Sequence, residues 1–121
     1  ATSSQGLASM HELLHAVSGM RLPVVITITN RALGNPVNVW NDHSDSISQR
    51  DTSWVQLYVE TVQEAVDTHL QAYKIAEELM LPVMVCVDGH SLTHSFEPVI
   101  MPSRETTGDF LPPFKFENKL D

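Results

Sequence analysis

The sequence has few cations, a single cysteine and no apolar run of membrane-spanning length. Lys and Arg together number 7 against 15 Asp and Glu, which gives a net charge of −8 over 121 residues. Because no basic cluster could follow a phosphate backbone, neither nucleic acid nor an anionic membrane is an expected partner. The start of the chain also lacks the basic and then apolar pattern of a signal peptide. We therefore expect a cytoplasmic protein that neither spans nor binds a membrane.

The only cysteine, Cys86, lies within the apolar run of residues 83–87. One thiol excludes an internal disulfide and a cysteine-ligated iron–sulfur cluster within this chain. A nucleophilic cysteine would need an activating neighbour, and none is evident in the run. We interpret Cys86 as a small buried core residue.

The apolar runs predict an α/β fold with a mostly parallel sheet and helices on both faces. Residues 23–29 form a continuous β-branched run, which is typical of a central strand covered on both faces. Residues 54–59 alternate as a strand does, and residues 83–87 form a second apolar strand. With 42% hydrophobic residues, the chain is about one domain long.

Two longer helices are predicted from periodicity and end signals. The first begins near Ser3 or Ser4 and ends at Gly19. The second follows the S/T-x-x-E capping box of residues 61–64 and ends before Pro82. The tail is expected to add an edge segment, a short helix and a Pro-rich arm, over residues 97–100, 103–110 and 111–116.

Residues 11–15, His-Glu-Leu-Leu-His, match the H-E-x-x-H signature of zinc peptidases. Two histidines four positions apart on a helix can reach one Zn²⁺, with Glu12 as general base. That chemistry needs a third protein ligand. Ser18 and Arg21 stand where the metzincin pattern has Gly and His, and no further Glu occurs before Glu60. We assign no metal site, interpret the segment as an amphipathic helix with two partly exposed histidines, and keep a zinc hydrolase as the third functional alternative.

Polar residues follow two of the predicted strands. Asn30 and Arg31 come after the first strand, and Asp88 and Gly89 after the last. Ligands of open α/β sheets bind at the carboxyl ends of the strands. The Arg31 guanidinium could there form two parallel hydrogen bonds to a carboxylate, or pair with a neighbouring Asp, and the residues alone leave both interpretations open.

Residues 42–46, Asp-His-Ser-Asp-Ser, gather two carboxylates, an imidazole and two hydroxyls. Such a cluster could bind a hard cation, act as a general acid and base, or form a turn in which Asp and Ser side chains bond their own backbone. The turn is the favoured interpretation.

Taken together, six blocks of the sequence resemble one family, the pyruvate:ferredoxin oxidoreductases and related 2-oxoacid:ferredoxin oxidoreductases, in the pyrimidine-binding domain of the α subunit. The blocks run in order over nearly the whole chain: residues 1–7, 30–33, 42–45 with 49–52, 62–65, 81–83 and 88–94. The resemblance implies an incomplete thiamine-diphosphate-binding fold of the pyrimidine-domain type over residues 1–110. Residues 111–121 would then be an arm leading toward a missing following domain.

The family resemblance also implies an activity. Members oxidatively decarboxylate pyruvate or a related 2-oxoacid, join the acyl group to coenzyme A and pass electrons to ferredoxin. Thiamine diphosphate with Mg²⁺ would be shared with another domain or subunit, and iron–sulfur clusters would lie only on partner regions. Other subunits, ferredoxin and coenzyme A are therefore the implied partners.

By position in the motif, Arg31 resembles the family arginine that binds the substrate carboxylate, and Asn30 beside it is expected to bind the substrate as well. The resemblance puts Asp42, His43 and Asp45 near the same pocket.

Two departures from the family pattern limit what the chain could do alone. Members carry a Glu that hydrogen-bonds the aminopyrimidine ring, and we expect it upstream of the segment matching residues 2–7. The sequence also contains no Gly-Asp-Gly metal–diphosphate motif. We assign no catalytic or cofactor-binding residue in this chain, and expect a fragment or separately encoded piece that is inactive alone. The alternative is a truncated, non-catalytic assembly or interaction domain of the same fold.

Overall fold

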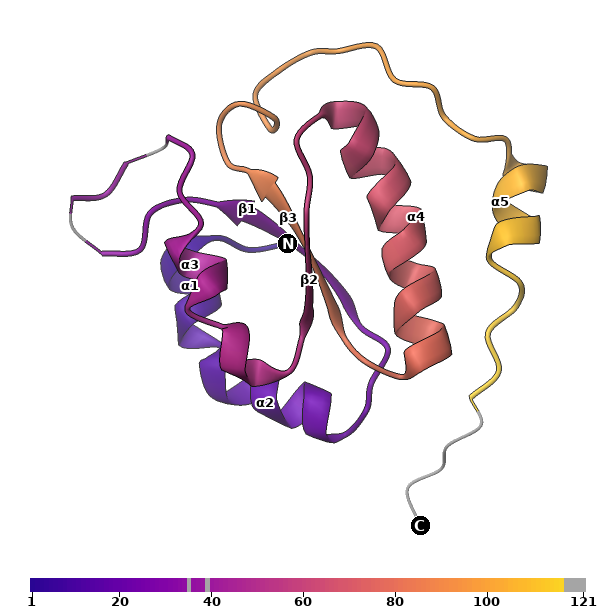
Figure 1. Ribbon diagram of the computed structural model, residues 1–121, viewed down its shortest axis with the longest axis horizontal. Helices are drawn as coiled ribbons and strands as arrows, with labels where there is room; N and C mark the ends of the chain where they lie inside the picture. The colour runs from indigo at the N-terminus through magenta and orange to yellow at the C-terminus, as the bar shows by residue number, and fades with distance from the viewer. Residues whose placement is uncertain (35, 39, 117–121) are drawn as a thin grey trace.

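The computed structural model describes residues 1–34, 36–38 and 40–116, and Figure 1 shows the arrangement of their helices and strands. The order is α1 (Ser4–Ser9), α2 (His11–Gly19), β1 (Val25–Asn30), α3 (Ser44–Ile47), the 3₁₀ helix η1 (Arg50–Thr52), β2 (Val55–Tyr58), α4 (Val62–Leu79), β3 (Val83–Asp88) and α5 (Arg104–Phe110). None of these helices is long and apolar enough to cross a membrane.

The described strands form one parallel sheet in the order β1-β3-β2. The predicted parallel sheet is confirmed, with Val83 paired to Val25 on one side and to Val55 on the other. The prediction that the run from residue 23 is the central strand is wrong, because β3 lies between the other two. Helices cover both faces of β1. Its continuous apolar run therefore indicates that both faces are covered, and does not indicate a central position in the sheet.

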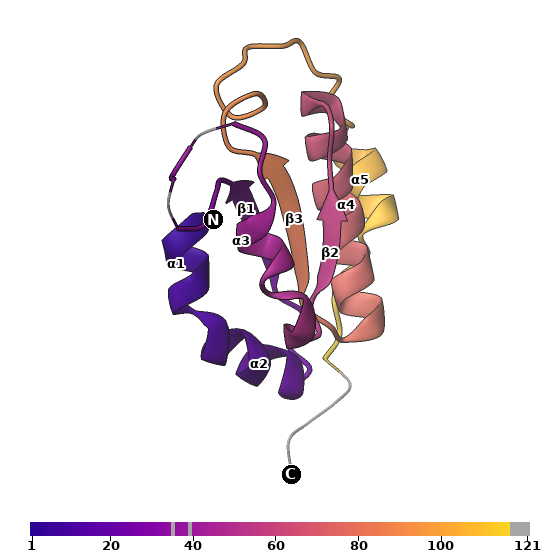
Figure 2. The same ribbon diagram turned by 60° about the vertical axis from the view of Figure 1, so that its left-hand side comes forward.

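Helices cover both faces of the sheet, as predicted (Figure 2). Successive side chains of β3 point to opposite faces. On one face Met84 and Cys86 join the core under α1 and α2, with Leu7, Leu14, Ile28 and Trp54. On the other face Val83, Val85 and Val87 pack with Val59, Ala72 and Ala76 under α4. The thiol of Cys86 is almost fully buried, and burial raises its pKa to about 11, which confirms a core role.

The N-terminal helix is interrupted, whereas the sequence predicted one continuous helix to Gly19. Met10 separates α1 from α2 with φ −92° and ψ 3°. The hydroxyl of Ser9 donates to the carbonyl of Gly6 at 2.9 Å, and the Met10 N–H donates to Leu7 at 3.1 Å, so the chain tightens there. The His-Glu-Leu-Leu-His segment lies in α2, in agreement with the helix interpretation.

The Thr61 half of the capping box predicted for α4 is present, whereas the Glu64 side chain bonds the residue before the N-cap. The Thr61 hydroxyl accepts a hydrogen bond from the Glu64 N–H at 3.1 Å, and the Glu64 carboxylate accepts from the Glu60 N–H at 2.8 Å. The helix ends at Leu79, where Met80 takes a left-handed conformation with φ 53°. Both ends therefore follow the sequence signals, and α4 is the crossover that makes β2 and β3 parallel.

The tail follows the prediction in part. Residues 97–100 form no strand, because the Gln63 side chain bonds both the N–H and the carbonyl of Ile100, at 2.7 and 3.1 Å. The predicted short helix is confirmed as α5, where the Ser103 hydroxyl accepts from the Thr106 N–H at 3.0 Å. Residues 112–116 have no regular structure, and residues 117–121 of the predicted arm lie outside the described part.

Gly89 allows the turn after β3 to approach β1. Its N–H donates to the Asn30 carbonyl at 3.0 Å, and a Cβ at position 89 would lie 2.3 Å from that oxygen. Backbone atoms cannot move aside as a flexible side-chain tip can. The two strand ends can therefore meet only with glycine at this position.

We expect Gly89→Ala to destabilise the protein by about 1–3 kcal/mol, because the methyl group forces the two strand ends apart. Urea unfolding followed by circular dichroism measures the change. Gly19→Ala is the matched control, since nothing lies within 4 Å of a Cβ there. Its effect should stay below about 1 kcal/mol. An unchanged midpoint for Gly89→Ala would contradict the close approach.

Candidate active-site edge

The carboxyl ends of β1 and β3 meet at one edge of the sheet, where ligands of this fold class bind. Asn30 and Asp88 are register partners, so their side chains project from the same face. Both are almost fully buried. The fold therefore brings Asn30 and Arg31 next to Asp88 and Gly89, at the strand ends where the sequence placed them.

Asp45, on α3, is the most densely bonded side chain at this edge. It is 1% exposed. Its Oδ2 accepts from the N–H groups of Ser4 and Arg31, at 2.9 and 3.2 Å. Its Oδ1 accepts from Asn30 Nδ2 and from the Ser46 N–H, both at 2.8 Å. The carboxylate thus joins three chain segments, and each of its two oxygens accepts two hydrogen bonds from the protein.

The other members of the 42–46 cluster have different surroundings. Asp42 Oδ1 accepts from the Ser44 N–H at 2.8 Å, which is the turn geometry favoured by the sequence. Hydrogen bonds from Ser44 hold the pKa of the Asp42 carboxyl below its ordinary value. The His43 ring lies 4.8 Å from the Tyr58 ring, measured between centroids. The two carboxylates of the cluster, Asp42 and Asp45, therefore accept hydrogen bonds from different donors.

A polar chain missed by the sequence interpretation links this cluster to β2. The Ser46 hydroxyl accepts from Asn30 Nδ2 at 2.9 Å and shares a hydrogen bond with the Tyr58 hydroxyl at 2.8 Å. Tyr58 donates to Gln56 Oε1 at 2.9 Å, and Gln56 Nε2 donates to the Ser46 carbonyl at 2.7 Å. Burial is the main cause that raises the pKa of the Tyr58 phenol. The one available signal was the pair of polar positions, 56 and 58, within an otherwise apolar strand.

Arg31 is half-buried directly after β1, and its guanidinium contacts a neutral partner. Its Nη2 donates to Gln5 Oε1 at 2.7 Å. Only its backbone N–H contacts Asp45. The ion pairs of the described residues are Arg50–Asp51 at 3.7 Å and Lys74–Glu78 at 4.0 Å, so within that part of the chain the guanidinium has no carboxylate partner. This geometry differs from the ion-pair alternative left open by the sequence.

Three buried polar atoms at this edge lack a hydrogen-bond partner among the described residues: Asn30 Oδ1, Arg31 Nε and Asp88 Oδ2. Burial raises the pKa of Asp88, but the N–H groups of His90 and Ser91, at 2.9 and 2.6 Å from its Oδ1, outweigh burial and leave the pKa below its ordinary value. Unpartnered buried polar atoms are uncommon in folded proteins. Their concentration here marks the edge as the candidate site.

The histidines of α2 have other neighbours. The His11 and His15 rings meet edge to face with centroids 5.0 Å apart, and His11 Nδ1 lies 2.6 Å from Gln49 Oε1. Over residues 1–34, 36–38 and 40–116, no three His, Cys, Asp or Glu side chains gather closely enough to hold a metal ion. The described segment thus offers no third ligand for zinc chemistry.

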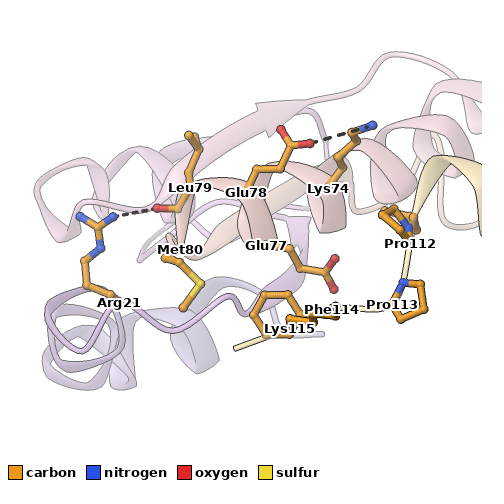
Figure 3. A pocket seen from close by; sticks show the side chains of 11 residues that line it. Arg21, Lys74, Glu77, Glu78, Leu79, Met80, Pro112, Pro113, Phe114 and Lys115 are labelled. Carbon is orange, nitrogen blue, oxygen red and sulfur yellow. Dashed lines mark hydrogen bonds and ion pairs between the residues drawn. The ribbon is translucent and has the colours of Figure 1, made fainter. Parts of the chain in front are cut away.

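A separate hollow of about 490 Å³ lies beside the last turns of α4, between that helix and residues 111–115 of the arm (Figure 3). Arg21 Nη2 donates to the Leu79 carbonyl at 2.8 Å at the helix end. Lys74 pairs with Glu78 and lies 4.3 Å from the Phe110 ring centroid. This hollow is at the far end of α4 from the carboxyl edge, and of its charged lining residues Lys74 and Glu78 pair with each other.

Comparison with known proteins identifies the family of the chain. Residues 1–120 match the family model described as pyruvate flavodoxin/ferredoxin oxidoreductase, thiamine diphosphate-binding. The chain belongs to this family. The family membership confirms the resemblance that the sequence blocks indicated, and with it the thiamine-diphosphate-binding type of α/β fold.

Curated relatives are similar over nearly the whole chain. Pyruvate synthase subunit PorA of Methanosarcina barkeri is 60% identical over 123 residues, covering 100% of this chain and 31% of the relative. PorA of Methanocaldococcus jannaschii is 58% identical, covering 92% and 29%. Ketoisovalerate oxidoreductase subunit VorA of Pyrococcus horikoshii is 50% identical, covering 99% and 32%. The chain thus spans about a third of the length of these relatives.

The described residues do not fit a complete thiamine diphosphate site. No three His, Cys, Asp or Glu side chains gather among the described residues, so that part of the chain holds no metal cage made of protein side chains alone. The acidic groups at the carboxyl edge are bonded to the protein: Asp45 to four donors and Asp88 Oδ1 to two. Among the described residues, Arg31 is a cation of this edge whose guanidinium has no carboxylate partner.

We expect Asp45→Asn to destabilise the fold by about 2–4 kcal/mol, because one acceptor oxygen becomes an amide that faces N–H groups. Thermal and urea unfolding measure the loss. Asp51→Asn is the control: Asp51 is exposed and pairs with the exposed Arg50, so its effect should stay below about 1 kcal/mol. Equal stabilities of the two variants would show that the hydrogen bonds of Asp45 contribute nothing to the free energy of unfolding.

Proposed function

We propose that this chain forms the pyrimidine-binding part of the α subunit of a 2-oxoacid:ferredoxin oxidoreductase. The assembled enzyme would oxidatively decarboxylate pyruvate or a related 2-oxoacid to acyl-CoA. Family membership over residues 1–120 supports the proposal, as do relatives named pyruvate synthase and ketoisovalerate oxidoreductase. Since relatives of both names are at least 50% identical to this chain, the choice of 2-oxoacid stays open.

Thiamine diphosphate with Mg²⁺ would lie between this domain and a second domain or subunit, and would supply the carbanion chemistry. A shared site is supported by the carboxyl edge itself, where Asp45 and Asp88 Oδ1 already accept hydrogen bonds from the protein. Iron–sulfur clusters would be carried by partner regions, and coenzyme A and ferredoxin would meet the whole complex. We expect the chain to be inactive alone.

Within that site, we assign Arg31 to the carboxylate of the 2-oxoacid. The observation that carries the assignment is that its guanidinium has a neutral hydrogen-bond partner, Gln5, and no carboxylate within the described residues. A planar guanidinium matches a carboxylate with two parallel hydrogen bonds. A half-buried position at the end of a rigid strand favours such a contact, because less solvent competes for it.

The remaining site residues would hold the backbone at Arg31 or surround its side chain. Asn30 and Asp45 are buried and bonded to each other at 2.8 Å. We therefore assign both to holding the strand end, in place of the substrate contact that the resemblance implied for Asn30. His43 is exposed beside Tyr58, and Asp42 lies one residue before it. We propose that these two residues line the rim of the pocket.

In the assembled enzyme, Arg31→Lys keeps the charge but loses the planar fork, and Arg31→Ala removes both. For the alanine variant we expect kcat/KM for the 2-oxoacid to fall roughly 30- to 1,000-fold, which corresponds to a loss of about 2–4 kcal/mol of transition-state stabilisation. The lysine variant should retain part of the activity. Steady-state kinetics measures both.

Arg50→Ala serves as the control, because Arg50 is exposed and pairs only with Asp51. Affinity for thiamine diphosphate should change far less than kcat/KM in the Arg31 variants. A near-normal kcat/KM for Arg31→Ala would show that Arg31 does not bind the substrate.

A further inference from the structure

We propose that Gln5 is a positioning residue for Arg31: its neutral side-chain oxygen holds the guanidinium in place while leaving the positive charge available to an incoming carboxylate. The inference rests on the proposed role of Arg31. Gln5 Oε1 accepts from Arg31 Nη2 at 2.7 Å, although the residues are 26 positions apart. No motif in the sequence pairs them, and only the fold brings them together.

The segment before Gln5 is clamped to the segment after β1. Ser4 is fully buried. Its N–H and that of Arg31 donate to the same oxygen, Asp45 Oδ2, and its hydroxyl donates to the Ala32 carbonyl at 2.9 Å. These bonds fix the backbone of Gln5 relative to Arg31, so the contact between their side chains starts from a rigid base.

Ser4 also has a strained backbone, with φ 44°. Left-handed conformations are unfavourable for residues other than glycine, and they persist where surrounding bonds enforce them. Three hydrogen bonds enforce this one: two made by Ser4 itself, and the Arg31 bond to the same Asp45 oxygen. The strained turn is what starts α1 beside the strand end and presents Gln5 to the guanidinium.

The neutrality of Gln5 is the functional part of the contact. A carboxylate at this position would form a charge-assisted pair with Arg31 and occupy the donors that a substrate carboxylate needs. An aliphatic side chain would leave the guanidinium without its anchor and free to change rotamer. Glutamine avoids both outcomes, because it accepts one hydrogen bond without neutralising the cation.

Gln5→Glu is an isosteric change that tests this role in the assembled enzyme. We expect KM for the 2-oxoacid to rise by roughly tenfold or more, with a much smaller change in kcat, because an internal carboxylate competes with the substrate. Gln71→Glu, the same change on the exposed side of α4, is the matched control and should leave KM unaltered. KM of Gln5→Glu equal to that of the control overturns the proposal.

A double-mutant cycle separates positioning from general stability. If Gln5 acts through Arg31, Gln5→Leu raises KM in the native background and has no further effect in the Arg31→Ala background. Equal effects in both backgrounds overturn the proposal and leave the role of Arg31 intact. A normal kcat/KM for Arg31→Ala alone overturns the proposed function and this inference with it. Gln5 is exposed, so both of its variants should fold, and a thermal melt verifies that.

Discussion

The buried carboxylate of Asp45 is the interaction on which the carboxyl edge depends. A carboxylate taken out of water is destabilising by several kcal/mol unless protein donors replace the lost hydration. Here four donors replace it, from the start of α1, the end of β1 and α3 itself. The segments are 41 and 14 residues from Asp45 in sequence. Loss of the carboxylate would release all three together, because each relies on the same two oxygen atoms.

This network explains how the half-buried Arg31 is held in a fixed place at the strand end. The main chain at Arg31 is held by Asp45 and continues into Ala32, whose carbonyl accepts from Ser4. Gly89 lets the turn after β3 close against the neighbouring Asn30 carbonyl. With the backbone fixed on both sides, the guanidinium has one neutral contact and retains its charge. In this account the fold supplies a positioned cation, and the remaining parts of the enzyme would supply the cofactor and the redox centres.

Local signals in the sequence predicted much of the fold. The Thr61 cap signal at residues 61–64 and the apolar run of β3 each act over a few residues, and the structure has both. Long-range choices were not predictable. The break at Met10 depends on which carbonyl the Ser9 hydroxyl bonds. The edge position of β1 depends on which strands pair with each other, and the pattern within one strand does not show that. The 42–46 cluster allowed three interpretations because the donors to Asp45 come from distant segments. The resemblance pointed to Arg31; Gln5 lies in the first resembling block, residues 1–7, but no sequence pattern paired it with Arg31.

Amide hydrogen exchange resolved to single residues tests the central role of Asp45 most directly. Slow exchange requires a hydrogen bond that opens rarely, and amides released by one event share its opening free energy. We predict that the amides of Ser4, Arg31 and Ser46 are protected and exchange with a common opening free energy below that of Val85 in β3. Rapid exchange of the Ser4 and Arg31 amides in the native protein, or three unrelated opening free energies, would contradict a single carboxylate holding these segments together.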